Sequence, residues 1–228
     1  MSVSEPYPAQ LLEAIRNWVN NFESSKRKAL AEALKGVLHF VEPEYKTCGV
    51  RCYRRIDIPD NPEDNSHGLL TPLLDMCNSG KMWESVSSWT TDLLIAKDHL
   101  EGVQSGGICA IFGHTPLPSE VWLNLNNFIK SPRLRPSDIG GNWVQGECEV
   151  ILNVTNVTAD EIISLGGFAG SMDLLRTTAS QMGVSDKTPN FESFLKSKAG
   201  TERWLSEEGT AAVVQRTFQK IREKHKPL

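Results

Sequence analysis

The segment Gln145-Gly-Glu-Cys-Glu-Val-Ile-Leu-Asn-Val154 decides the fold of this chain. Its side chains alternate after the glycine, which is the period-two pattern of a half-buried strand. One face carries Cys148, Val150, Leu152 and Val154, and the other carries Glu147, Glu149, Ile151 and Asn153. Both carboxylates are therefore expected to project from the same face, roughly 7 Å apart along the backbone. Two like charges at that spacing repel each other, so the pair is expected to face either water or a cation.

The composition is that of an ordinary globular protein. Of the 228 residues, 39% are hydrophobic and 23% are charged, and the formal net charge is −4. This net charge gives no electrostatic reason to expect broad affinity for nucleic acids or membranes. The start of the chain lacks the basic and apolar regions of a secretory signal, and no apolar stretch has membrane-spanning length. A cytoplasmic protein is therefore predicted.

The cysteines form an odd set, without a Cys-x-x-Cys motif or a histidine group beside them. Such a set is typical of reduced thiols in a cytosol rather than of disulfides or zinc ligands. The five are Cys48, Cys52, Cys77, Cys109 and Cys148. No metal site is therefore predicted.

Helical and strand patterns divide the chain into three parts and predict the α+β class. Residues 1–47 are expected to form a helical hairpin, because two apolar runs each follow a helical period. These runs are Leu11, Ile15, Trp18 and Phe22, then Leu30, Leu34, Val37 and Leu38. Residues 48–165 are the core, with strands predicted at 49–58, 85–90, 108–113, 121–125 and 147–157 and a helix at 92–101. Residues 166–228 are a helical extension, with helices predicted at 171–182, 190–198, 201–206 and 210–225.

Arg54 is the sole charge on an otherwise apolar strand face. That face consists of Val50, Cys52, Arg54, Ile56 and Ile58. A buried guanidinium without an anion is very costly, so Arg54 needs a negative partner. The partner is either a core carboxylate in a structural ion pair, or a ligand phosphate, which suits the planar guanidinium well.

A second strand carries hydroxyl groups immediately before a helix, within residues 85–100. Ser88 and Thr90 share one face of this strand, and Trp89 lies on the other. Thr91 and Asp92 are residues that favour the start of a helix. Taken alone, this arrangement is ordinary turn chemistry.

Taken together, three motifs resemble the cholera-toxin-like Arg–Ser–Glu group of mono-ADP-ribosyltransferases. They are Tyr53-Arg54 in a strand, Ser88-Trp-Thr-Thr91 ahead of a helix, and Glu147-Cys-Glu149 running into apolar residues, in the order that the family shows. The resemblance covers roughly residues 48–157. Thr90 stands where the family often has serine, which keeps a hydroxyl, and Arg55 stands where the family often has glycine.

The resemblance implies an ADP-ribosyltransferase-type fold of two small packed β-sheets, with NAD as the substrate and no metal. The nicotinamide–ribose bond of NAD breaks through an oxocarbenium-like state, which a carboxylate can stabilise. The resemblance gives that role to Glu149, with Arg54 holding the NAD phosphates and Ser88 orienting the carboxylate and the ribose. The NAD site is completed by Tyr53, Trp89 and Thr90.

The same resemblance bears on the acceptor of the ADP-ribose. Glu147 is expected to accept the proton of the acceptor or to pair with its guanidinium. Family members with glutamate at this position often modify arginine, so a protein arginine is the expected target. Trp143, in the turn-rich loop 131–145, is either a recognition aromatic or simply packs under that loop.

Several alternatives remain open for the function. The acceptor is alternatively RNA or DNA, as for a toxin or an anti-phage effector. The negative net charge argues only weakly against this, because a local basic patch is sufficient for contact with a nucleic acid. Water as the acceptor leads to NAD hydrolysis alone. An inhibitory partner protein is a further expectation. A non-enzymatic interaction protein is the remaining alternative, with Glu147 and Glu149 in water and Arg54 in a structural ion pair.

Overall fold

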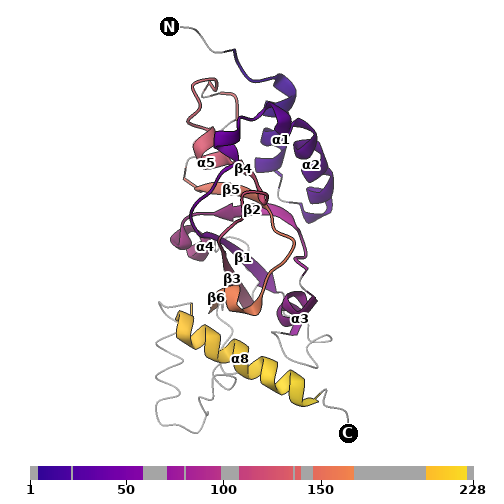
Figure 1. Ribbon diagram of the computed structural model, residues 1–228, viewed down its shortest axis with the longest axis vertical. Helices are drawn as coiled ribbons and strands as arrows, with labels where there is room; N and C mark the ends of the chain where they lie inside the picture. Colours follow the sequence, from indigo (N-terminus) through magenta and orange to yellow (C-terminus); the bar gives the residue numbers. More distant parts are fainter. Residues whose placement is uncertain are drawn as a thin grey trace. The chain divides into compact units, whose positions relative to one another are not determined.

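The computed structural model describes residues 5–21, 23–58, 71–79, 81–98, 108–135, 137–139, 146–166 and 204–224. Helices and strands are mixed along the chain, which confirms the α+β class (Figure 1). The helices are α1 (Ala9–Val19), α2 (Ser24–Val37), α3 (Thr71–Ser79), α4 (Leu93–Asp98), α5 (Leu125–Phe128) and α8 (Glu207–Lys224). The strands are β1 (Cys52–Ile58), β2 (Val86–Thr90), β3 (Ile108–His114), β4 (Val121–Asn124), β5 (Glu149–Asn153) and β6 (Ile162–Gly166). Short 3-10 helices lie at η1 (Leu38–Phe40), η2 (Pro43–Lys46) and η5 (Ala159–Glu161).

The strands hydrogen-bond in the order β4-β5-β2-β1-β3-β6. The pairs whose register is described are all antiparallel. This single order corrects the prediction of two small packed sheets, because β1 lies between β2 and β3 in one hydrogen-bonded series. The chain divides within β1 into two compact units. Unit 1 contains Met1–Tyr53, Met82–Ile95 and His114–Thr155, and unit 2 contains Arg54–Lys81, Ala96–Gly113 and Asn156–Leu228.

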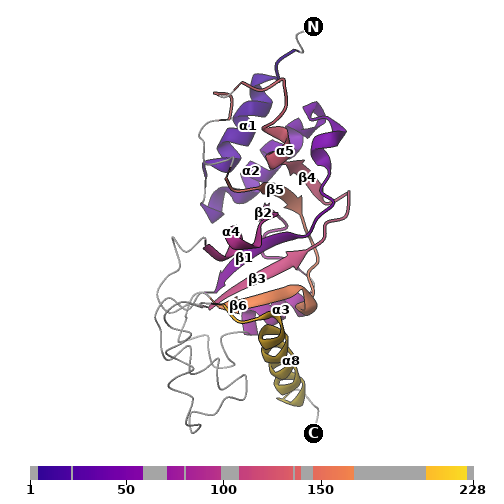
Figure 2. The same cartoon turned by 90° about the vertical axis from the view of Figure 1, so that its left-hand side faces the viewer.

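In unit 1, α1 and α2 form the predicted helical hairpin and pack against β4 and β5 (Figure 2). Leu11, Ile15 and Trp18 recur at helical spacing on α1, and all three are buried. Their core continues through Leu34 of α2 to Leu123, Leu125, Phe128 and Ile151. Burying a large apolar side chain contributes about 1.5–3 kcal/mol. This core therefore fixes which face of α1 meets the sheet, and with it the position of Trp18.

Strand β5 lies between β4 and β2 and is shorter than predicted. It runs from Glu149 to Asn153, within the predicted range 147–157. It begins late because residues 146–148 form a turn, in which Cys148 has a φ of 50°. A positive φ takes the backbone out of the extended conformation, so the alternation does not reach back to Glu147.

The other strands predicted for the core are confirmed as β1, β2, β3 and β4. The helix predicted at 92–101 is confirmed as α4, described from Leu93 to Asp98. Neither α3 nor β6 was predicted. Every residue of β6 is buried, so its apolar run does not alternate as a half-buried strand does.

In unit 2, β3 pairs with β6, and α8 packs against β6. The backbone N–H of Leu165 donates to the Thr210 hydroxyl at 3.1 Å, and that of Leu205 donates to the Leu165 carbonyl at 2.8 Å. Helix α8 confirms the helix predicted at 210–225 and begins three residues earlier, at Glu207.

Two other predictions for the C-terminal part have different outcomes. The helix predicted at 201–206 is wrong for its described residues, because Trp204 instead forms a β-bridge with Gly166. This bridge extends the edge of β6, whose backbone groups need partners. The helices predicted at 171–182 and 190–198 lie outside the described residues. Every helix in the described part of the chain is too short or too polar to span a membrane.

Candidate functional site

The side chain of Glu149 is the centre of a buried polar cluster in unit 1. It is only 5% exposed, although it is the first residue of β5. The hydroxyl of Ser88 donates a hydrogen bond to its Oε1 atom. The indole Nε1–H of Trp18 reaches the same Oε1 atom at 3.3 Å and Ser88 Oγ at 3.1 Å. One carboxylate oxygen thus has donors from α1 and from β2.

The register of β2 against β5 explains why Ser88 and Glu149 meet. Thr90 lies directly opposite Glu149, and Ser88 lies directly opposite Ile151. Residues paired in an antiparallel ladder project to the same face, and diagonal neighbours are within reach of each other. Ser88 is the diagonal neighbour of Glu149 on the face where Ile151 contacts the helical hairpin. The packing of the hairpin on this face therefore places Trp18 over the hydrogen-bonded pair of Ser88 and Glu149.

Arg27 of α2 supplies a cation to this cluster. Its guanidinium carbon lies 5.0 Å from the centroid of the Trp18 ring, in a cation–π contact. Its positive charge also lowers the pKa of Glu149. The Nη1 atom of Arg27 is buried and has no hydrogen-bond partner among the described residues. A buried donor in this state costs about 1–3 kcal/mol, so an acceptor brought by a ligand is expected to stabilise the site.

The pKa of Glu149 is raised, first because burial disfavours the charged carboxylate. The hydrogen bond from Ser88 opposes this rise, and the negative charge of Glu147 adds to it. The bond from Trp18 and the charge of Arg27 also lower the pKa, but burial and repulsion prevail. The ionisation of Glu149 is therefore set by its burial and by four neighbouring side chains.

Glu147 lies in the turn before β5, so the two carboxylates do not project from one strand face as predicted. Cys148, the residue between them, has a φ of 50°. Strand β2 holds this turn, since the Thr90 hydroxyl donates to the Glu147 carbonyl at 2.8 Å and the Thr91 N–H donates to the Cys148 carbonyl at 3.1 Å. Glu147 is half-buried, whereas Glu149 is buried. Two carboxyl groups of different exposure therefore lie at one end of β5.

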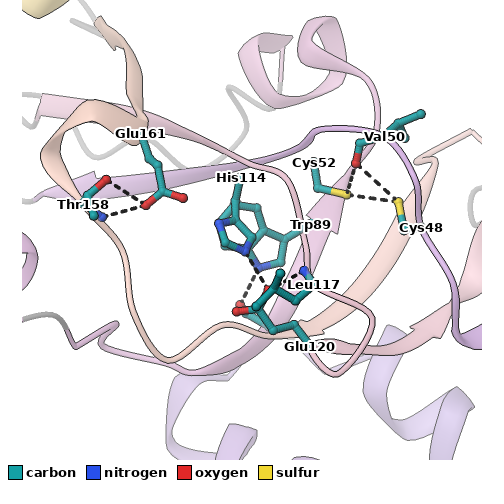
Figure 3. Close-up of polar contacts among 10 residues, drawn as sticks. Cys48, Val50, Cys52, Trp89, His114, Leu117, Glu120, Thr158 and Glu161 are labelled. Atoms are coloured by element: carbon teal, nitrogen blue, oxygen red, sulfur yellow. Dashed lines mark hydrogen bonds and ion pairs between the residues drawn. The ribbon is translucent and has the colours of Figure 1, made fainter.

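Trp89 and Tyr53, both predicted to contact NAD, have different surroundings. Trp89 is 1% exposed, and its indole N–H donates to Ser87 Oγ at 3.1 Å. The centroid of its ring lies 5.8 Å from that of His114, which bonds to Glu120 (Figure 3). Trp89 is thus packed within the core on the other face of β2. Tyr53 is half-buried and pairs with Thr90 in the strand ladder.

Arg54 is the first residue of unit 2 and directly follows Tyr53 along β1. It is half-buried, and Cys52 and Ile56, which share its face of the strand, are buried as predicted. Trp143 lies outside the described residues, as does the rest of the stretch 140–145. Of the predicted site residues, unit 1 brings together Ser88, Thr90, Glu147 and Glu149.

The sequence did not single out Arg27, nor Trp18 as a site residue. Arg27 lies in the run Lys26-Arg27-Lys28, whose composition is typical of a solvated helix face. Trp18 was assigned to the hairpin core from its helical spacing. Its ring nitrogen was the available signal, because a buried indole N–H usually has an acceptor.

The cluster offers a carboxyl group held by a hydroxyl, with a guanidinium nearby. Such a set is suited to a ligand that carries hydroxyls and develops positive charge, as a sugar does at its anomeric carbon. Within the described part of the chain, no group of three or more His, Cys, Asp or Glu side chains is placed to hold a metal ion. Comparisons with protein-family models, curated proteins and solved structures find no match to this chain.

Proposed function

We propose that this chain is an NAD-dependent mono-ADP-ribosyltransferase, which cleaves the nicotinamide–ribose bond and transfers ADP-ribose to an acceptor. The observation that carries the proposal is the hydrogen bond from Ser88 on β2 to Glu149 at the start of β5. The two residues belong to two of the three motifs that resemble the Arg–Ser–Glu group. A hydroxyl bonded to a carboxylate is suited to orienting that carboxylate toward a sugar ring.

Glu149 is assigned the stabilisation of the positive charge that develops on the ribose as nicotinamide leaves. An ionised carboxylate meets this charge, and its attraction is stronger in a water-poor site than in bulk water. The same burial raises the pKa of Glu149. Ser88 and Arg27 both oppose that rise, so both favour the ionised state that the reaction uses.

Trp18 is assigned a covering role over the carboxylate. Its indole N–H bonds to the oxygen of Glu149 that also accepts the hydrogen bond from Ser88. A ribose hydroxyl that binds this Oε1 atom has to replace or share the bond from Trp18. Displacement of Trp18 is therefore part of substrate binding in this proposal.

The remaining roles follow the resemblance and the exposure of each group. The NAD phosphates are assigned to Arg54, whose planar guanidinium suits a phosphate. The acceptor is assigned to Glu147, which is more exposed than Glu149 and lies two residues before it. A protein arginine is the proposed acceptor, because a guanidinium pairs well with a carboxylate. The proposal includes a cytoplasmic location, which the five free cysteines favour.

Nicotinamide release from NAD by the purified chain tests the reaction. The wild type is expected to release nicotinamide, and Glu149→Gln is expected to lower the rate by a factor on the order of 100 or more. Glu13→Gln is the matched control, because Glu13 is exposed on α1 and the change is the same. No release of nicotinamide by the wild type, and no change on Glu149→Gln, would support the non-enzymatic interaction protein.

The acceptor is identified by transfer of label from radioactive NAD into a cell extract. Label that protease removes and nuclease does not identifies a protein acceptor, and hydroxylamine treatment distinguishes an arginine linkage from others. Label that only nuclease removes identifies RNA or DNA as the acceptor. Nicotinamide release without stable label identifies water, and hence NAD hydrolysis.

A further inference from the structure

Cys48 and Cys52 form a close pair of thiols in unit 1. Their sulfur atoms lie 3.4 Å apart, and the carbonyl oxygen of Val50 lies 3.6 Å from Cys48 Sγ and 3.7 Å from Cys52 Sγ (Figure 3). A disulfide bond is about 2.05 Å long, so the two sulfurs are at hydrogen-bonding rather than bonding distance. A shift of little more than 1 Å, which side-chain rotation can supply, separates the thiols from a disulfide.

The two thiols differ in their exposure to solvent. Cys48 is half-buried within the stretch 47–51, whose other members are exposed; among them, Val50 is 55% exposed. Cys52 is fully buried at the start of β1. A β-carbon added to Gly49 would meet nothing within 4 Å, so the chain between the two thiols is free of packing at that point. A reagent in solution therefore reaches Cys48 before Cys52.

We propose that Cys48 and Cys52 are a modification site, at which a peroxide converts the two thiols into a reversible disulfide. Cys48 reacts first with the peroxide, and Cys52 then resolves the product. The inference rests on the sulfur–sulfur distance and on the unequal exposure of the two side chains. It is independent of the proposed transfer of ADP-ribose.

The ionisation of the pair agrees with this order of events. The hydrogen bond from Cys52 lowers the pKa of Cys48 to about 6, although partial burial opposes the shift. The pKa of Cys52 is raised above its usual range, because its proton is held in that bond and the group is buried. At neutral pH Cys48 is therefore the thiolate, which is the nucleophilic form of the group.

The oxidation balances with one molecule of peroxide. The Cys48 thiolate attacks one oxygen, so that an S–O bond forms and the O–O bond breaks, and the hydroxide that leaves takes up a proton to become water. The product is a sulfenic acid at Cys48. The sulfur of Cys52 then attacks the sulfur of Cys48, an S–S bond forms and the S–O bond breaks, and a second water leaves with the Cys52 proton. Two thiols are oxidised and one peroxide is reduced to two waters.

The two thiols lie next to a row of paired residues that crosses β1, β2 and β5. Tyr53, which follows Cys52, pairs with Thr90, and Thr90 pairs with Glu149. A disulfide closes a ring over residues 48–52 and thereby restrains the start of β1. The oxidation state of Cys48 and Cys52 is therefore connected, through β1 and β2, to β5, the strand that carries Glu149.

Peptide mapping of the full chain tests the modification directly. Trypsin cuts after Lys46, Arg51 and Arg54, so Cys48 falls in peptide 47–51 and Cys52 in peptide 52–54. After a few equivalents of hydrogen peroxide and blocking of free thiols, mass spectrometry is expected to show these two peptides joined. The number of titratable thiols in the unfolded chain is expected to fall by two from the original five, and dithiothreitol is expected to restore them.

Variants assign the order of the two steps. Cys52→Ser is expected to stop at the sulfenic acid of Cys48, which dimedone traps as an adduct on peptide 47–51. Cys48→Ser is expected to leave Cys52 unmodified, and Cys77→Ser, the matched control, is expected to form the joined peptide as the wild type does. Recovery of the two wild-type peptides unjoined after peroxide, or joined to peptides of other cysteines, would overturn the proposal. Absence of the dimedone adduct in Cys52→Ser would overturn the assignment of Cys48 as the first thiol.

Discussion

The hydroxyl of Ser88 is hydrogen-bonded to the carboxylate of Glu149 from the neighbouring antiparallel strand. Trp18, from α1, donates to both of them. Three elements that are far apart in the sequence thus meet at one carboxyl group beneath the helical hairpin. Because each contact changes the balance between the ionised and protonated forms, changes in these side chains are expected to appear in the ionisation of Glu149.

Glu149→Gln is expected to increase the stability of the fold relative to the wild type as the pH rises. Burial raises the folded-state pKa of Glu149, so the wild-type side chain contributes its stability below the ordinary glutamate pKa of about 4.3 and loses it as the pH rises through the raised value. Urea unfolding midpoints of both proteins between pH 4 and pH 8 measure the difference. Glu13→Gln, at an exposed position, is expected to show no such trend, and a constant difference at every pH would contradict the raised pKa.

Arg27→Gln is expected to move the acidic limb of nicotinamide release to higher pH. The charge of Arg27 lowers the pKa of Glu149, so its removal leaves a smaller ionised fraction at a given pH. The rate is measured between pH 5 and pH 9. Lys28→Gln removes a charge from an exposed neighbour on the same helix and is expected to leave the profile in place. An unshifted profile for Arg27→Gln would show that this guanidinium does not act on the carboxylate.

Ser88→Ala is expected to slow nicotinamide release roughly 10-fold to 100-fold at neutral pH. A hydrogen bond to a charged group contributes about 1.5–3 kcal/mol, and each 1.4 kcal/mol corresponds to about one tenfold step in rate. Ser88→Thr keeps the hydroxyl and is the matched control, expected to retain most of the rate. Equal losses in the two variants would assign the effect to packing in β2 rather than to the hydroxyl.

Trp18→Phe is expected to lower the KM for NAD several-fold while kcat stays within a factor of a few. The change removes the indole N–H that bonds to Glu149 and keeps an aromatic ring in the hairpin core, so a ribose hydroxyl no longer competes for the carboxylate. Steady-state kinetics measure the two constants. Trp122→Phe alters another tryptophan packed on the same core and is expected to leave the KM unchanged. A raised KM in the folded Trp18 variant would instead identify Trp18 as a direct contact of the substrate.

Glu147→Gln is expected to leave nicotinamide release largely intact and to reduce transfer to the acceptor. Glu147 lies in the turn outside β5, where it is more exposed than Glu149 and is assigned the acceptor rather than the ribose. Parallel assays of nicotinamide and of labelled acceptor give the ratio of the two activities. Equal loss of both would refute this division of labour between the two carboxylates.

The strands that carry the site were predictable because their patterns are local. Ser88 and Thr90 alternate with the buried Trp89, and Val150 to Leu152 is a buried apolar run directly after the acid. Strand β6 was not predictable from alternation, because it is buried along its whole length and its sequence shows no polar face. Alternation gives no signal for a strand whose sequence carries no polar face.

The prediction for Glu147 failed at a single backbone angle. Period two places both glutamates on one face only if every residue between them is extended. Cys148 has a φ of 50° instead, a conformation that non-glycine residues seldom adopt and that no pattern in this sequence marks. The bonds from Thr90 and Thr91 to the turn, which lie 57 residues away along the chain, hold the backbone in that conformation.

By itself, the sequence determined the mixture of helices and strands and the apolar faces of the hairpin. It also singled out Ser88 and Glu149, whose side chains are hydrogen-bonded in the structure. These depend on side chains within a few positions of one another, where helical and strand periods apply. Only the tertiary structure decided that Trp18 covers Glu149, 131 residues away, and that Arg27 lends it a positive charge. The reason is physical: a period shows which face of an element is buried, whereas the packing of the hairpin on β5 selects which residues that face meets.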